Sequence, residues 1–130
     1  MSARFLTKEH APAVARIALG LVFFLFGIDQ LLHPILWTAW IPDWTSIMLP
    51  AEKIVMLNGV LDLTLGTLLL LGLFTRLVAA IAVLHLAGIV ATVGYNDIGI
   101  RDLGFLILAI SIFLNGPDLW SLDHKYRKKF

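Results

Sequence analysis

The chain has 130 residues, of which 59% are hydrophobic and 15% are charged, and its formal net charge at pH 7 is +1. This composition excludes a soluble domain of this size, because too few polar side chains remain to cover its surface. The lack of cysteine excludes disulfides, thiol redox chemistry and thiolate metal sites, and the near-neutral charge gives no reason to expect a nucleic-acid partner.

The apolar segments predict an all-α membrane protein, an antiparallel bundle of four transmembrane helices that forms a single domain over residues 1–130. The predicted spans cover about residues 14–32, 54–73, 77–95 and 98–114, each near the length that crosses a hydrocarbon core of about 30 Å. Within lipid each span must be helical, because the backbone has no water to bond. The first span follows a basic N-terminus, as in a signal peptide, but no cleavage site follows it, so we expect it to be retained.

Short links and small residues predict how these spans pack. The link at Thr75 and Arg76 between the second and third spans is so short that the two spans must form an antiparallel hairpin. Two glycines lie seven residues apart on the first span and two on the second, and small residues let helices approach closely in lipid: Gly20, Gly27, Gly59 and Gly66.

Basic residues predict the orientation. With four spans, both termini and the Thr75–Arg76 link lie on one side, and Lys53 and Arg101 lie on the other. The first side then holds eight of the ten basic residues: Arg4, Lys8, Arg16, Arg76, Lys125, Arg127, Lys128 and Lys129. The positive-inside rule therefore predicts a multi-pass protein of the cell (inner or cytoplasmic) membrane with both termini in the cytoplasm.

Tryptophans mark the predicted membrane surfaces. In the loop 34–53, Trp37, Trp40 and Trp44 are spaced i, i+3 and i+7, so on a short interfacial helix they share one face. Trp120 would lie at the opposite surface. Two interpretations of the loop stay open: an aromatic belt that anchors it at headgroup level, or a lid over a binding site.

Polar side chains gather in the outer half of the predicted bundle. A charged residue at the centre of a span costs about 2.5–3.5 kcal/mol on insertion scales, so each needs a partner. We expect Arg101 to pair with Asp62, and otherwise with Asp29, since a guanidinium holds carboxylates well. Such a cluster either pins the helices as a structural ion pair or lines a pocket for the head group of a lipid or quinone. The candidate ligand-binding residues are Asp29, His33, Asn58, Asp62, His85 and Arg101.

Metal, haem and catalytic sites are not expected. His85 has no second histidine at helical spacing, and a lone histidine in a helix more often bonds a neighbouring helix than a metal. We therefore predict no metal ligand, no catalytic residue and no covalently bound cofactor, and a quinone is the one cofactor that such a pocket could take.

Three stretches resemble the DoxX family of small four-span membrane proteins: "RIALGLVFFLFGIDQLLHP", "LDLTLGTLLLLGLFTRLVAAIAV" and "NGPDLWSLD". The resemblance covers nearly the whole chain. It implies a four-helix bundle and membership of a group named for a membrane component associated with thiosulfate:quinone oxidoreductase in archaeal respiration. Most members have no assigned activity.

The chain departs from the family pattern at two positions. The acid of the second span is Asp62, where the family more often has Glu, and Gln30 stands where a Lys is common. Losing that lysine makes Arg101 the more plausible cationic partner of Asp62. Thr75 and Arg76 match the family turn, where Arg76 is expected to bond the last carbonyls of the second span.

Two functional hypotheses follow. The first is a non-catalytic integral membrane subunit or scaffold that docks a larger membrane oxidoreductase or respiratory assembly, binds lipid or quinone, and has the redox cofactors elsewhere. The second is a quinone-reactive unit or small carrier that uses Asp29, Asp62 and Arg101. A carrier would show internal repeats with helices broken at the midplane, and none is visible. The expected partners are the bilayer and that larger complex, with assembly into a homo-oligomer also open.

Overall fold

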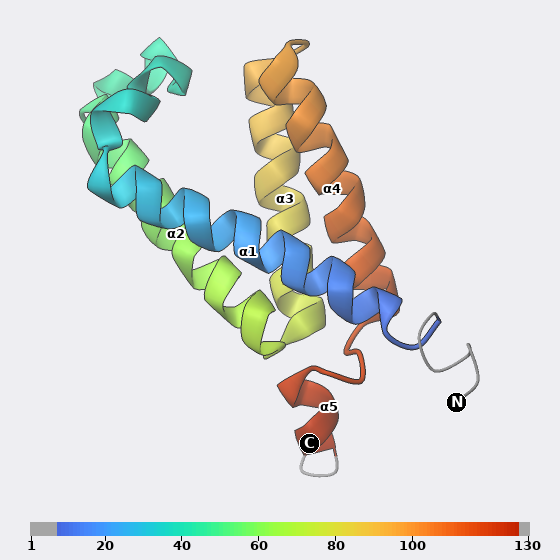
Figure 1. The fold of residues 1–130 in the computed structure, drawn as a ribbon. Coiled ribbons are helices and arrows are strands. Elements are labelled where there is room, and N and C mark those ends of the chain that lie inside the picture. Colours follow the sequence, from blue (N-terminus) through green and yellow to red (C-terminus); the bar gives the residue numbers. More distant parts are fainter. Residues whose placement is uncertain (1–7, 128–130) are drawn as a thin grey trace.

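The computed structural model describes residues 8–127, and all of its regular secondary structure is helical (Figure 1). Four helices are long. Shorter ones follow the first and the last of these. In chain order the elements are α1 (Ala11–Leu32), the 3₁₀ helices η2 (Pro34–Trp40) and η3 (Asp43–Ile47), α2 (Ala51–Leu71), α3 (Thr75–Val93), α4 (Asp97–Asn115) and α5 (Leu122–Tyr126).

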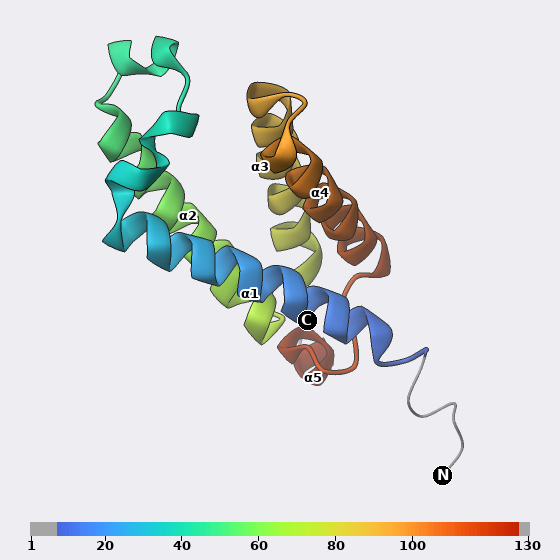
Figure 2. The ribbon, with the colours of Figure 1, turned by 45° about the horizontal axis from the view of Figure 1, so that its top comes forward.

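The four long helices form two antiparallel hairpins. α1 packs mainly on α2, and α3 packs mainly on α4, with fewer contacts between the hairpins. The hairpins approach each other beside α5 and diverge toward η2 and η3, as both views show (Figures 1 and 2). We call the end with η2, η3 and the α3–α4 link the loop end, and the opposite end, with α5 and the α2–α3 turn, the terminal end.

Glycines bring α1 and α2 together. A Cβ added at Gly27 would lie 2.5 Å from the backbone nitrogen of Leu63, and one added at Gly66 would collide with the backbone of Phe24. Neither position has room for a side chain, so the two backbones touch directly. The heptad spacing of these glycines thus has the packing role expected of it.

The hydrophobic core fills the space where the hairpins meet. All four long helices contribute to it: Leu19, Phe23, Leu65, Leu69, Val78, Ala79, Ala82, Leu86, Ala109 and Ile112. The outward faces are also apolar, with Leu25 55% and Leu57 61% exposed. Because a soluble protein would hide such residues, these faces are suited to lipid.

Three of the described helices are long and apolar enough to cross a membrane: α1, α2 and α3. α4 has the same length as α3 but carries Asp97, Arg101 and Asp102 within its first two turns. The sequence therefore locates the four helical segments, while the crossing of α4 stays a prediction.

Helix boundaries differ from the prediction at the α2–α3 turn. The predicted link Thr75–Arg76 is wrong, because both residues belong to the first turn of α3. The chain turns instead at Gly72, whose φ of 72° lies in the left-handed region that glycine tolerates, and at Phe74, with φ of 51°. The apolar run continues past the end of α2, so hydrophobicity alone does not show where this helix ends.

The loop between α1 and α2 is not the single helix predicted for it. Two 3₁₀ helices are separated at Ile41 and Pro42, since Pro42 has no backbone N–H with which to continue the first. The three loop tryptophans therefore do not share one helical face, because Trp37 and Trp40 belong to η2 and Trp44 belongs to η3.

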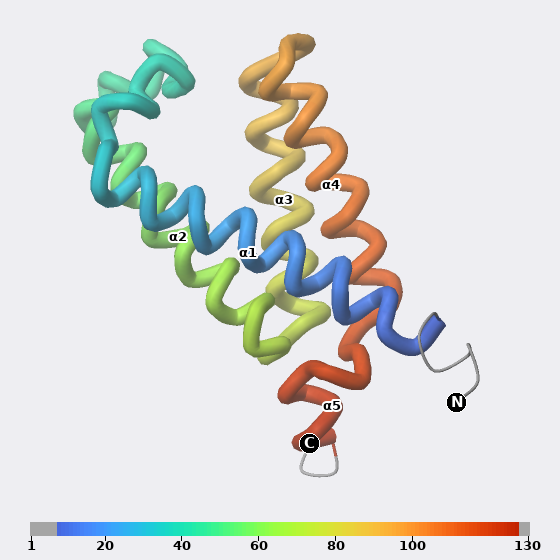
Figure 3. Tube along the Cα trace, in the orientation of Figure 1, coloured from blue at the N-terminus to red at the C-terminus, as the bar shows by residue number. Residues whose placement is uncertain are grey.

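The C-terminal segment clamps the α2–α3 turn. The carboxylate of Asp123 accepts hydrogen bonds from the backbone nitrogens of Phe74 and Thr75, at 2.8 and 2.7 Å. The backbone nitrogen of Asp123 donates to the carbonyl of Gly72 at 3.0 Å. These bonds hold α5 against the turn at the terminal end (Figure 3).

Candidate functional site

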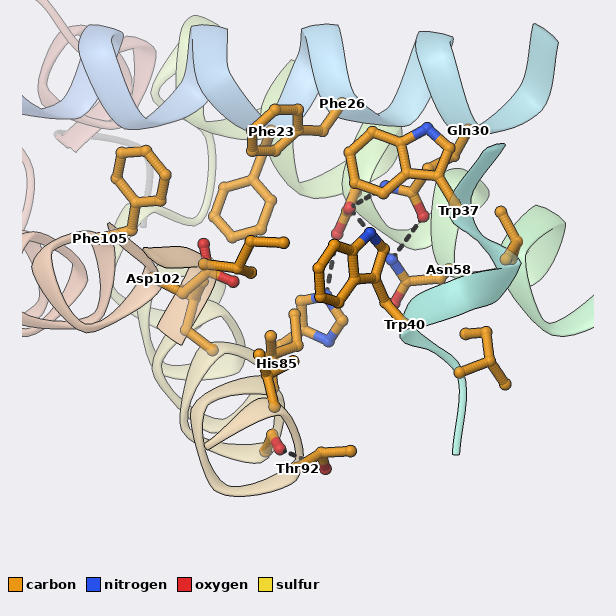
Figure 4. Close-up of a pocket in the computed structure, with 18 of the residues that line it drawn as sticks. Phe23, Phe26, Gln30, Trp37, Trp40, Asn58, His85, Thr92, Asp102 and Phe105 are labelled. Atoms are coloured by element: carbon orange, nitrogen blue, oxygen red, sulfur yellow. Dashed lines mark hydrogen bonds and ion pairs between the residues drawn. The ribbon is translucent and has the colours of Figure 1, made fainter. Parts of the chain in front are cut away.

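A cavity of about 750 Å³ lies between the two hairpins toward the loop end. Side chains from η2, η3 and all four long helices line it. Its walls are largely apolar, and many of the lining residues are aromatic: Trp44 and, labelled in Figure 4, Phe23, Phe26, Trp37, Trp40 and Phe105. An apolar cavity of this size with a few polar groups is the usual form of a small-molecule site.

Five of the six predicted ligand-binding residues line this cavity: Asp29, Asn58, Asp62, His85 and Arg101. His33 does not line it, because it follows the last residue of α1 and is exposed. α1, α2, α3 and α4 each contribute at least one of the five, so the cavity exists only when both hairpins are in place.

Asp62 is the centre of a hydrogen-bond network at the cavity wall. Its Oδ2 accepts from Gln30 Nε2 at 2.7 Å and from Asn58 Nδ2 at 3.2 Å. Its Oδ1 lies 2.9 Å from Nε2 of His85. Asn58 Nδ2 also donates to Gln30 Oε1 at 2.7 Å, as Figure 4 shows. The side chain of Asp62 is 5% exposed, and this network compensates its burial.

The predicted ion pair between Asp62 and Arg101 is wrong. Arg101 Nε donates to Asp102 Oδ1 at 2.9 Å, and the guanidinium carbon lies 5.0 Å from the ring centre of Phe26. A carboxylate one residue away and an aromatic face satisfy this arginine locally. Asp62 therefore obtains its donors from amides and a histidine.

The other proposed partner of Arg101 is also engaged elsewhere. Asp29 Oδ2 accepts from the indole nitrogen of Trp37 at 2.8 Å. This bond ties the first residues beyond α1 to the cavity wall. Arg101, Asp29 and Asp62 share one cavity but not one ion-pair cluster.

Gln30 is a residue whose role the sequence reading missed. It is 3% exposed and donates directly to Asp62. Its position in the sequence could have indicated this role, since Gln30 stands where the resemblance implied a lysine. A neutral donor occupies the place of that cation.

A second polar cluster, also missed, lies at the terminal end. Arg16 Nε and Asp118 Oδ2 are 2.6 Å apart, and Arg16 is 1% exposed. Arg16 Nη1 also donates to the carbonyls of Leu69 and Leu70, at 2.5 and 3.1 Å. One arginine thus joins α1, the end of α2 and the segment after α4. An arginine within an apolar run, together with an acid after a Gly-Pro exit, was the signal.

Arg76 does not bond the carbonyls predicted for it. Its Nε donates to the carbonyl of Phe113, on α4, at 3.2 Å. The last carbonyls of α2 are instead bonded by Arg16. Helix α3 starts next to the end of α4, which puts Arg76 within reach of α4 rather than of α2.

Of the four predicted interfacial anchors, Trp37, Trp40 and Trp44 line the cavity near the loop end. Trp120 lies at the terminal end, with its ring centre 5.2 Å from that of His10. The loop tryptophans therefore lie where a cover over the cavity would need them.

Comparison with known proteins bears on this architecture. The DoxX family profile matches residues 11–95, which include α1, the loop, α2 and α3. A protein of Mycobacterium tuberculosis named "Uncharacterized membrane protein Rv3486" is 29% identical over 147 aligned positions, covering 97% of this chain and 88% of the relative. No solved structure matches significantly. The chain is a membrane protein and belongs to the DoxX family.

Proposed function

We propose that this protein is a non-catalytic integral membrane subunit that holds the head group of a quinone or lipid in the cavity between its hairpins. The observation that carries the proposal is the buried hydrogen-bond network of Asp62 in the wall of an aromatic cavity of about 750 Å³. Aromatic walls suit a flat ring, and a few fixed polar groups suit its oxygen substituents.

The polar groups support binding rather than chemistry. Asp62 is held by three neighbouring side chains, and Asp29 is held by Trp37. These bonds suit both carboxylates to a positioning role. Arg101 stacks near Phe26, from where its terminal nitrogens can donate to a ligand oxygen.

The proposal includes four membrane spans with both termini in the cytoplasm. α4 has 19 residues, which at about 1.5 Å per residue nearly matches a hydrocarbon core of about 30 Å. Its outward face is apolar, with Ile107 60% and Leu114 71% exposed. The cavity would then open toward the outer leaflet, since the loop end faces away from the basic termini.

We further propose that the subunit serves a larger membrane oxidoreductase. The chain has no cysteine, so iron–sulfur clusters or redox disulfides for such a reaction would lie on the partner. Purification in a mild detergent from the native membrane tests this step. A stoichiometric partner with redox cofactors supports it, and a chain that always elutes alone contradicts it.

Tryptophan fluorescence tests the binding site. Three of the four tryptophans line the cavity, so a Trp120→Phe protein reports on the cavity alone. We expect a decyl-chain quinone to quench this emission saturably. A linear, non-saturating response equal to that of free tryptophan in the same micelles would contradict the site.

A further inference from the structure

We propose that the cavity prefers a head group that donates hydrogen bonds, so that it selects the reduced quinol over the oxidised quinone. The inference rests on the proposed function for the location of the site, and it adds the chemical form of the ligand. The evidence for it is the set of hydrogen-bond donors and acceptors around Asp62 that the protein leaves unused.

With Asp62 ionised and His85 neutral, the bond between them determines which ring nitrogen carries hydrogen. An ionised carboxylate only accepts, so Nε2 of His85, 2.9 Å from Oδ1, carries the hydrogen. In the neutral imidazole the other nitrogen, Nδ1, is then a bare acceptor. Within residues 8–127 no side chain or backbone group bonds to Nδ1, and His85 lines the cavity (Figure 4).

Neighbouring groups are also left as acceptors. Asn58 uses Nδ2 for both Gln30 and Asp62, and its Oδ1 has no partner in the described part of the chain. Asp29 uses Oδ2 for Trp37, and its Oδ1 is likewise open. The hydroxyl of Thr92, which also lines the cavity, donates to a backbone carbonyl of its own helix.

Apart from the second N–H of Gln30 Nε2, which lies beside Asp62, the available donors lie in more exposed positions. They are the terminal nitrogens of Arg101, whose side chain is 40% exposed, and the indoles of Trp40 and Trp44, which are 47% and 68% exposed. By contrast the side chains of His85 and Asp62 are 14% and 5% exposed. The more buried wall therefore offers mainly acceptors, and the more exposed part of the cavity offers most of the donors.

A quinone and its quinol respond differently to such a wall. The quinone has only carbonyl acceptors, so an oxygen that faces Nδ1 of His85 loses its hydration without gaining a bond. The quinol has two hydroxyl groups, one of which can donate to Nδ1 while its oxygen still accepts from a donor such as Arg101. One such bond corresponds to a preference of about ten-fold.

Three matched ligands test the inference on the Trp120→Phe protein: a decyl-chain quinone, its quinol kept reduced under anaerobic conditions, and the dimethyl ether of the quinol. The ether keeps the reduced ring but has no O–H. Quenching by the quinone gives the Kd of the quinone. Displacement of the bound quinone gives the Kd values of the quinol and the ether. We expect the quinol to bind about ten-fold more tightly than both the quinone and the ether.

Variants distinguish a preference that depends on the cavity wall from a difference in how the ligands partition into micelles. His85→Leu should reduce the preference to the partition baseline, and His85→Gln, which keeps a donor and an acceptor, should retain part of it. His33→Leu, outside the cavity, should leave it unchanged. Should His85→Leu fail to fold, the comparison of quinol with ether in the parent protein still decides the question.

The outcomes distinguish the two proposals. Quinone and quinol with equal affinity, or an ether that binds as well as the quinol, would overturn the preference and leave the binding site intact. Saturable binding by none of the three ligands would overturn the proposed function together with the preference that depends on it.

Discussion

Nε2 of His85 and Oδ1 of Asp62 lie 2.9 Å apart, and the bond joins α3 of one hairpin to α2 of the other. Removing the donor by His85→Leu leaves Oδ1 unpaired in a buried wall. We expect the free energy of unfolding to fall by about 0.5–2 kcal/mol, measured by titration of detergent-solubilised protein with dodecyl sulfate.

A double-mutant cycle isolates this bond. Asp62→Leu combined with His85→Leu should destabilise the protein by less than the sum of the single changes, because the double variant leaves neither member of this pair without its partner. The loss of Asp62 as acceptor for Gln30 and Asn58 occurs in both Asp62→Leu proteins and cancels from the cycle. His33→Leu is the matched control, since His33 is exposed and lies outside the cavity. Strict additivity would show that the bond contributes nothing.

The buried pair of Arg16 and Asp118 should contribute more to stability than any exposed charge. Asp118→Asn leaves the guanidinium of Arg16 buried with only carbonyl partners. We expect a loss of about 3 kcal/mol or more in the free energy of unfolding. Asp43→Asn, at an exposed position of η3, should change it by less than about 0.5 kcal/mol. Equal effects of the two variants would contradict the structural role of the pair.

Close packing of α1 on α2 predicts opposite responses at two glycines. Gly66→Ala places a Cβ against the backbone of Phe24, and we expect it to destabilise the protein by about 1–3 kcal/mol. Gly88→Ala has open space around the added Cβ, so it should be neutral or stabilising, by up to about 1 kcal/mol. Thermal unfolding in one detergent compares the two, and a harmless Gly66→Ala would show that the helices are further apart.

The topology is testable because the chain has no cysteine of its own. Single cysteines at Ser46 and Tyr95 should react with a membrane-impermeant maleimide from outside intact cells. A cysteine at Lys125 should react only after permeabilisation. Labelling of Lys125→Cys from the same side as Tyr95→Cys would show that α4 does not cross the membrane.

The positions of the long helices were predictable because lipid requires long apolar runs, and such runs are visible in sequence. The α2–α3 turn was not, since Gly72 and Phe74 stop the helix by backbone conformation inside a continuous apolar run. The prediction of a single interfacial helix was wrong because Pro42 interrupts it, and this proline is visible in the sequence.

Among the polar residues, the sequence indicated which ones face the bundle interior but not how they pair. Arg101 was paired with a distant acid because partners were sought between helices, whereas Asp102 lies next to it in the chain. Gln30 was overlooked because a neutral amide has no charge to balance. Pairings of this kind depend on the rotation of each helix, and hydrophobicity fixes that rotation only coarsely when most helix faces are apolar.

The most direct test of ligand binding between the hairpins is to fill the cavity with a side chain. Gly88 lines it and Gly104 does not, and an added Cβ meets nothing within 4 Å at either position. Phenylalanine at either glycine should therefore leave the fold intact. The Kd of the decyl-chain quinol is then measured for Gly88→Phe and Gly104→Phe. We expect loss of saturable binding in the first variant and parent affinity in the second, whereas equal affinity in both would contradict binding between the hairpins.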